Sequence, residues 1–329
     1  MKKNLIILLM LMSMVFTARS QEKIFGKYKK PPLLLKLEAY QKKHKKDMEA
    51  LGFVISYNKI LPYSPVDIIP FAQTTGRCQL GFLTDFSSIE DLADAPIILT
   101  QTCPDYGEWG PANILIAKDL RSYLMLTASI DEIYYQEMLD YLMSRKSFND
   151  FYKDVNPDKD FIIERKKNLQ EHYDSISAHI GKSKQNVKRL NILKEFGIDP
   201  VTDPVGMMKE LIRWRNEMTT IKTFDDIGIV YKTSLSAPVR FDEVDLEDIS
   251  AVKKFIANSS LPQRLKWYRY VLSYEDIYFL DKENRSDVKE LIVQALKNDG
   301  YFREADALGS DYYLDSNFKG KKRWLKGHF

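Results

Sequence analysis

The pattern of apolar residues changes character about halfway along this chain of 329 residues. Between residues 53 and 130 it consists of short apolar runs bounded by glycine, proline, aspartate and serine, which is typical of β-strands. The expected strands are Phe53–Ile55, 67–71, 80–83, 96–100 and 114–117. Helices are expected on both sides of them, at 33–50, 118–127 and 131–141. This half therefore predicts an α+β domain, a small sheet flanked by helices.

Helical periodicity dominates after a polar, turn-rich segment at 146–160, which we interpret as a linker. Apolar residues there recur at steps of three and four, as on one face of a helix. The stripes are Leu169, Tyr173, Ile176, Ile180; Met207, Leu211, Trp214, Met218, Ile221; Leu261, Leu265, Tyr268, Leu272; and Val288, Leu291, Ile292, Ala295. One isolated strand is expected at 227–232. The sequence thus predicts an α+β domain at 21–145 and a mostly helical domain at 161–329.

Residues 1–20 have the composition of an export signal. Lys2 and Lys3 precede an apolar run from Leu5 to Phe16, and small residues lie at Ala18 and Ser20. This order is typical of a secretory signal peptide, here with cleavage between Ser20 and Gln21. A membrane anchor is the alternative, but a span needs roughly 17–25 apolar residues. We therefore expect a periplasmic or secreted protein with no membrane span after signal removal.

Cys78 and Cys103 are the two cysteines of the chain. An exported compartment permits disulfides, so these residues are a disulfide candidate. Two buried free thiols whose Cα atoms lie too far apart to bond are the alternative. A metal site is less favoured, because no histidine or second cysteine lies at ligand spacing. We expect neither a metal nor another cofactor.

Catalytic motifs are absent from the sequence. It has no nucleophile elbow, no zinc-protease motif, no phosphate-binding loop and no kinase signature. His172 and His179 are too far apart on a helix to hold one metal together, since helical ligand pairs lie three or four residues apart. Adjacent carboxylates such as Glu90 and Asp91 are usually solvated. No residue set argues for an enzyme.

Charge is unevenly distributed along a chain that is neutral after signal removal. The 49 basic and 46 acidic residues become 46 of each when Lys2, Lys3 and Arg19 leave with the signal. No basic residue lies between Arg77 and Lys118, whereas that stretch has six acidic ones: Asp85, Glu90, Asp91, Asp94, Asp105 and Glu108. Basic segments flank it, including nine lysines within residues 21–47 and a cluster at 182–189. A field of one sign can steer a partner of the opposite sign, so these six acids are candidate contacts for a protein partner. An ordinary solvated surface is the alternative, and no nucleic acid is expected.

The order of motifs between residues 50 and 130 resembles the SUKH superfamily. The residues that carry the resemblance are Pro70-Phe71-Ala72, Gly76, Gly81-Phe82, Pro96 and the segment Ala117 to Leu124. The superfamily includes bacterial immunity proteins and yeast cell-wall regulators of the Smi and Knr type. The resemblance implies a non-catalytic α+β module, in bacteria typically one that neutralises a toxin by direct contact. Most such proteins are cytoplasmic single domains, whereas this chain has an export signal and a helical half.

Three functional hypotheses follow. The first is an exported binding module, an immunity protein in the form that the resemblance implies, with the acidic stretch as its contact surface. The second is an envelope adaptor or structural protein that binds through the helical half. The third is an uncharacterised hydrolase, which would require a buried carboxyl with a shifted pKa in a cleft. Truncation near residue 150 is expected to separate the first two, since only the first predicts that residues 21–150 keep the partner.

Overall fold

The computed structural model describes residues 24–57, 60, 64–74, 78–100, 113–130 and most of 187–309. Gaps within the last range are 224, 226, 234, 236, 241–243 and 274–285, and a few helical positions between 167 and 178 are also described. The expected signal peptide, the helix at 131–141, the linker and both His172 and His179 lie outside the described residues. The N-terminal half is α+β and the chain after it is mostly helical, which confirms the predicted fold class.

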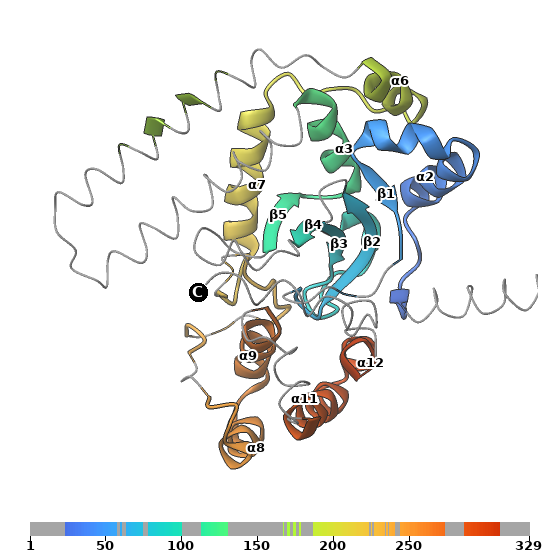
Figure 1. Cartoon of the computed structure of the whole chain (residues 1–329). Helices are drawn as coiled ribbons and strands as arrows, with labels where there is room; N and C mark the ends of the chain where they lie inside the picture. The colour runs from blue at the N-terminus through green and yellow to red at the C-terminus, as the bar shows by residue number, and fades with distance from the viewer. Residues whose placement is uncertain are drawn as a thin grey trace, which may run out of the picture.

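Five antiparallel strands form one sheet with the simple order β1-β2-β3-β4-β5 (Figure 1). The strands are β1 (Phe53–Ile55), β2 (Ile68–Thr74), β3 (Gln79–Leu83), β4 (Ile97–Thr100) and β5 (Asn113–Ala117). Each lies close to its predicted position. Residues of β3, β4 and β5 are buried throughout, so both faces of these strands are covered. This explains why these strands are apolar runs rather than alternating sequences.

A proline lies within β2, which pairs with β1 on one side and with β3 on the other. Pro70 pairs with Gly81 and Ala72 with Leu80, so the register shifts at Phe71. Proline lacks the N–H that a regular ladder uses, and a bulge is one of the places where a sheet tolerates it. The Pro-Phe-Ala motif thus forms the irregular part of β2, which is a local structural role.

Both edges of the sheet are covered. Helix α2 (Pro32–Lys43) lies beside β1, where the amide of Gln41 takes the place of a further strand. Its Nε2 donates to the Ile55 carbonyl oxygen at 2.9 Å, and its Oε1 accepts from the Ile55 N–H at 2.7 Å. Helix α7 (Pro204–Met218) contacts β5 at the opposite edge. Covered edges do not offer unpaired backbone groups to another chain.

The remaining described helices are α3 (Leu120–Ser129), α6 (Val187–Glu195), α8 (Ile249–Asn258), α9 (Leu261–Ser273), α11 (Ser286–Asn298) and α12 (Phe302–Gly309). The predictions for α3, α7, α9 and α11 are confirmed, whereas α6, α8 and α12 were not predicted. Two expectations need correction. The helix expected at 33–50 breaks at His44, after which a 3-10 helix, η1, continues over Lys45–Leu51. Within the described part of 227–232, an isolated bridge between Ile229 and Ile221 takes the place of the expected strand.

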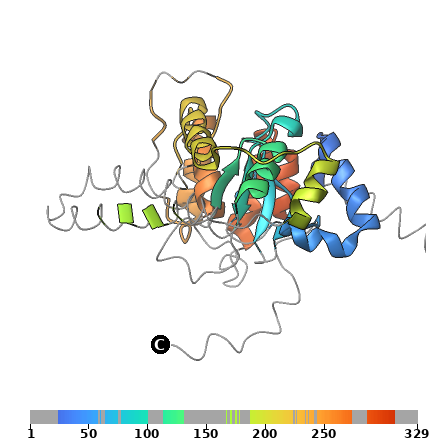
Figure 2. The same ribbon diagram turned by 90° about the horizontal axis from the view of Figure 1, so that it is seen from above.

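One hydrophobic core runs through both halves of the chain. It includes strand residues such as Ile69 and Phe82 and helix residues such as Leu211, Trp267 and Leu308. Helices α2, α3 and α6 lie near one end of the sheet, and α9, α11 and α12 near the other, next to the loop that follows β3 (Figure 1). Turned by 90°, the molecule shows the C-terminal helices beside the strands (Figure 2). The helical half is therefore packed on the sheet.

Candidate functional site, the loop after strand β3

The most unusual backbone of the described chain lies just after β3. Asp85, Phe86 and Ser87 have φ angles of 47°, 51° and 67°. Left-handed backbone is uncommon for residues other than glycine, and each such residue costs roughly 1–2 kcal/mol. Three in succession persist only where surrounding contacts fix them, and strain of this kind is concentrated at functional sites. The loop of residues 84–94, here called the β3 loop, is therefore the first candidate for a functional surface.

Arg215 of α7 fixes the first of these residues. Its two terminal nitrogens donate to the two carboxylate oxygens of Asp85 at 2.7 and 2.6 Å, a bidentate pair between two buried side chains. The same guanidinium donates to the carbonyl oxygens of Ile227 at 2.9 Å and Gly228 at 2.7 Å. Bidentate pairs of this kind combine strength with fixed geometry. The backbone direction at Asp85 is thus set by a helix 130 residues further along the chain.

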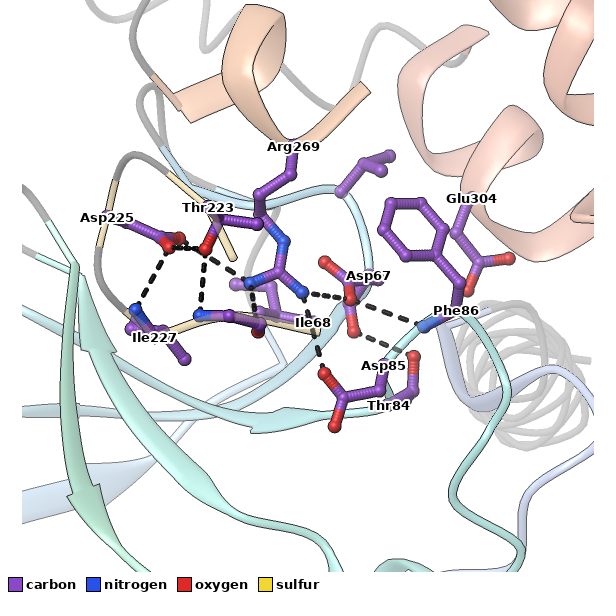
Figure 3. A network of polar contacts seen from close by, with 12 residues as sticks. Asp67, Ile68, Thr84, Asp85, Phe86, Thr223, Asp225, Ile227, Arg269 and Glu304 are labelled. Atoms are coloured by element: carbon purple, nitrogen blue, oxygen red, sulfur yellow. Dashed lines mark hydrogen bonds and ion pairs between the residues drawn. The ribbon is translucent and has the colours of Figure 1, made fainter. Parts of the chain in front are cut away.

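Arg269 of α9 lies among three aspartates (Figure 3). Its Nη2 contacts Asp67 Oδ2 at 2.5 Å and Asp85 Oδ1 at 3.7 Å, and its Nη1 lies 3.5 Å from Asp225 Oδ2. The guanidinium also faces the ring of Phe86, 5.8 Å from the centroid, a cation–π arrangement. These five ionisable side chains (Asp67, Asp85, Asp225, Arg215 and Arg269) are called the buried ion network below.

Further hydrogen bonds complete the network. Asp67 lies just before β2, and its backbone carbonyl accepts from the Thr84 N–H at 2.9 Å and the Thr84 hydroxyl at 2.8 Å. Asp67 Oδ2 also accepts from the Phe86 N–H at 3.3 Å. Thr223 donates to Asp225, whose Oδ1 in turn accepts from the Ile227 N–H at 3.2 Å. The β3 loop is therefore bonded to the segment before β2 as well as to the helices.

Electrostatics single out Asp67 within the network. Three carboxylates face two guanidiniums, and in the described chain Asp67 Oδ1 and Arg269 Nε have no hydrogen-bond partner. Burial raises the pKa of the Asp67 carboxyl, with Arg269 opposing the shift and the charges of Asp85 and Glu304 adding to it. Burial lowers the pKa of Arg269, but the three neighbouring aspartates outweigh it and the net shift is upward. For Asp67 the net pKa shift is upward, so burial outweighs the attraction of Arg269.

The hydrolase hypothesis requires a carboxyl with a shifted pKa that a substrate can reach. Asp67 has the shifted pKa, but its side chain is fully buried and ion-paired with Arg269. A general acid must come within hydrogen-bond reach of the reacting group. The arrangement around Asp67 instead joins the strands to α9, which is a structural role.

Other segments hold the far end of the β3 loop. The Tyr28 hydroxyl, from the N-terminal segment, donates to the Ile89 carbonyl oxygen at 3.0 Å. Lys232 Nζ lies 2.9 Å from Glu90 Oε1 in an exposed ion pair. Phe86 packs on Tyr301, with ring centroids 5.4 Å apart. The loop is thus contacted from the N-terminal segment, from α7, from the stretch after it, from α9 and from the residue before α12.

The structure distributes the predicted acidic contacts over different environments. Asp85 is not on the surface: its side chain is fully buried, so its place in the expected acidic surface is corrected. Glu90 and Asp94 are exposed, and the exposed Asp91 caps the short helix η2 (Leu92–Asp94) by accepting from the Ala93 N–H at 2.8 Å. Asp105 and Glu108 lie outside the described residues. The exposed part of the expected surface is therefore Glu90, Asp91 and Asp94.

The disulfide stays a prediction. Cys78 lies half-buried just before β3, and its N–H donates to the Thr74 hydroxyl at 3.3 Å. Its expected partner Cys103 lies outside the described residues. Among the residues that the structure does describe, no group of histidine, cysteine, aspartate and glutamate side chains could hold a metal ion.

Sequence reasoning missed the arginines that organise this site. Arg215 follows the buried Leu211 by four positions, and Arg269 follows the buried Leu265 by four. Each therefore lies on the apolar face of its helix. An arginine at such a position requires a buried acidic partner, and this was the available signal. The sequence does not indicate which aspartate supplies it.

Comparisons with known proteins add no assignment. No model of a protein family matches the sequence, and no curated protein matches it. In the described part of the chain, the helices are all too short or too polar to cross a bilayer.

Proposed function

We propose that this is an exported protein-binding module of the immunity-protein kind, which contacts its partner through the β3 loop. The observation that carries the proposal is the construction of this loop. Three left-handed residues are held by buried arginines, and directly after them Glu90, Asp91 and Asp94 are exposed. A loop that is already ordered loses little conformational entropy on binding, which favours recognition. Binding residues are often placed on such loops over a rigid scaffold.

Two further features support the proposal. The strands β2 to β5 and helix α3 follow one another in the order that the SUKH resemblance implies. The ion pair between Glu90 and Lys232 is exposed, so water and salt screen it and Glu90 can exchange Lys232 for a cation on a partner. Export itself is proposed from the signal-like residues 1–20.

The test compares three variants of the chain that begins at Gln21. The loop variant is Glu90→Gln/Asp91→Asn/Asp94→Asn, in which asparagine retains an oxygen that can cap η2. The matched control removes three exposed acids elsewhere, Glu217→Gln/Glu290→Gln/Asp306→Asn. The partner is first sought among envelope proteins and the product of the adjacent reading frame, and its binding is then measured with purified components.

The expected result is a fall of about tenfold in association rate for the loop variant, with a smaller change in dissociation rate. The salt dependence of association should weaken in parallel, because the steering charges are removed. The control should behave as the unaltered protein does. Unchanged association of the loop variant would overturn the proposal and favour the adaptor hypothesis, in which the helical half makes the contact.

Truncation near residue 150 is not a suitable test. It would remove Arg215 and Arg269 and leave Asp67 and Asp85 without their partners. A buried charge without a partner is strongly destabilising, so loss of binding would then report unfolding. Point substitutions on the surface avoid this ambiguity.

A further inference from the structure

Two lysine-rich segments that are far apart in the sequence lie side by side in the fold. The first is α2 with η1, and the second is α6 (Figure 2). Arg189 joins them, since its Nε donates to the Ala50 carbonyl oxygen at 2.7 Å across 139 positions of sequence. The ring of Phe196, just after α6, packs on Tyr40 of α2 with centroids 5.5 Å apart. Lys188 of α6 and Asp47 of η1 form an ion pair at 2.7 Å.

This packing concentrates positive charge. Across α2, η1 and α6 there are eight basic and four acidic residues. Seven of the basic residues are exposed lysines, here called the lysine surface: Lys36, Lys42, Lys43, Lys45, Lys46, Lys188 and Lys194. Bringing like charges together opposes folding. The exposed Glu90 of the β3 loop is paired instead with Lys232, far away in the sequence. The lysine surface is therefore a positive field that the fold itself assembles.

Apolar side chains are exposed among these lysines. Leu35 is 49% exposed and Val187, beside Lys188, is 69% exposed. Leu35, Ala39 and Lys42 are spaced by four and three residues, so they share the outer face of α2. A helix face that combines exposed apolar residues with lysines is typical of helices that lie on a membrane surface. The apolar groups enter the headgroup boundary while the long lysine side chains reach anionic headgroups.

We infer that the lysine surface docks the protein reversibly onto membranes that contain anionic lipid. Clusters of four to eight lysines or arginines are sufficient for attraction to such surfaces. Nucleic acid fits less well, because the patch is built from lysine with no exposed arginine in these three elements, and arginine is preferred for bidentate phosphate and base contacts. The exposed Leu35 and Val187 favour lipid over an acidic protein. This inference does not depend on the proposed partner of the β3 loop.

The experiment is co-sedimentation of the chain from Gln21 onward with vesicles of phosphatidylcholine, with and without phosphatidylglycerol. The test variant is Lys42→Gln/Lys43→Gln/Lys45→Gln/Lys46→Gln. The control removes four other exposed lysines, Lys222→Gln/Lys253→Gln/Lys254→Gln/Lys297→Gln. A third variant, Leu35→Ser, probes the apolar contact. Circular dichroism checks that each variant is folded, and glutamine retains good helix propensity.

The expected result is binding to the anionic vesicles alone, weakened at least about tenfold in the test variant and by added salt, and unchanged in the control. Leu35→Ser should weaken binding while leaving the salt dependence intact. Equal loss in the control would overturn the inference, since net charge would then suffice. Absence of binding to the anionic vesicles would also overturn it, as would full binding of the test variant. If polyglutamate competed fully and Leu35→Ser had no effect, the surface would instead bind an acidic protein.

Discussion

Arg215 and Asp85 form a bidentate ion pair that is almost completely withdrawn from water, with side-chain exposures of 2% and 0%. The pair joins α7 to the turn after β3 across 130 positions of sequence. Burying two charges has a large desolvation cost, which the two matched hydrogen bonds of this pair offset. Its value to the protein is best measured by removing one partner at a time.

Replacement of Arg215 by methionine should destabilise the fold by about 3–5 kcal/mol, because Asp85 would remain buried with its main partner gone. Chemical denaturation measures this change. Arg213→Met on the same helix is the control, since Arg213 pairs with Glu210 at the surface and should cost less than about 1 kcal/mol. The double variant Asp85→Asn/Arg215→Met should lose less than the sum of the single variants by about 0.5–3 kcal/mol. Strict additivity would show that the two side chains are not coupled.

Asp67 should make stability fall as pH rises. Its pKa is raised in the folded state above an unfolded value of about 3.9. The stability that it contributes is therefore fully present below about pH 4 and is lost as pH rises through the folded-state pKa. The unfolding free energy of the unaltered protein, minus that of Asp67→Asn, should decrease over this range.

Asp47 supplies the opposite case for the same measurement. The hydrogen bond from Lys188 lowers the pKa of the Asp47 carboxyl, so its contribution is lost as pH falls through the folded-state value. The corresponding difference for Asp47→Asn should therefore increase with pH. If both differences changed in the same direction, the pKa direction inferred for one of these aspartates would be wrong.

Gln41 should be important for the edge of the sheet. Leucine at this position keeps the volume but removes both hydrogen bonds to Ile55. We expect a loss of about 1–3 kcal/mol, because the β1 backbone groups lose their partners. Amide hydrogen exchange at Ile55 should also accelerate. Gln294→Leu, whose exposed amide bonds to Asn298 within one helix, should leave both quantities nearly unchanged. Unaltered exchange at Ile55 would mean that water replaces the glutamine without cost.

Gly228 should tolerate alanine poorly. Its φ of +73° is left-handed, a Cβ there would overlap the Thr219 side chain, and its carbonyl accepts from Arg215. Gly300 has a φ of +87° with no atom within 4 Å of the added Cβ, so Gly300→Ala isolates the backbone strain of about 1–2 kcal/mol. Gly228→Ala should cost about 1–3 kcal/mol more than Gly300→Ala, because its Cβ also overlaps the Thr219 side chain. Equal melting transitions for the two variants would contradict this assignment.

The strands could be predicted because each is a short apolar run between turn residues. Phe53–Ile55 was predicted at its observed bounds, whereas Gln79 and Asn113 extend β3 and β5 with buried polar residues that the apolar pattern omits. The break at His44 could not be predicted, because the flanking residues all favour helix. The His44 ring stacks on Tyr40 there, and such a contact follows from the folded backbone.

The buried ion network was beyond prediction for a different reason. Its pairs join residues up to 202 positions apart, and the sequence has many aspartates that could have been the partners. Asp85 was read as a surface acid because it lies in an acidic stretch without lysine or arginine. Its neutralising arginine comes from α7 instead, so a charge map along the chain differs from the charge map of the surface.

The buried ion network also constrains the order in which the chain can reach its final structure. Arg269 follows Asp67 by 202 residues, so at a synthesis rate of about 5–20 residues per second roughly 10–40 s separate their appearance. During that interval the β2 and β3 segments can form local pairs, but Asp85 lacks its arginine until α7 is synthesised and Asp67 lacks its arginine until α9 is synthesised. Pairing of such distant residues is intrinsically slow. All five strands lie before residue 118, so the sheet can pair early, whereas the buried ion network is completed only when α9 has been synthesised.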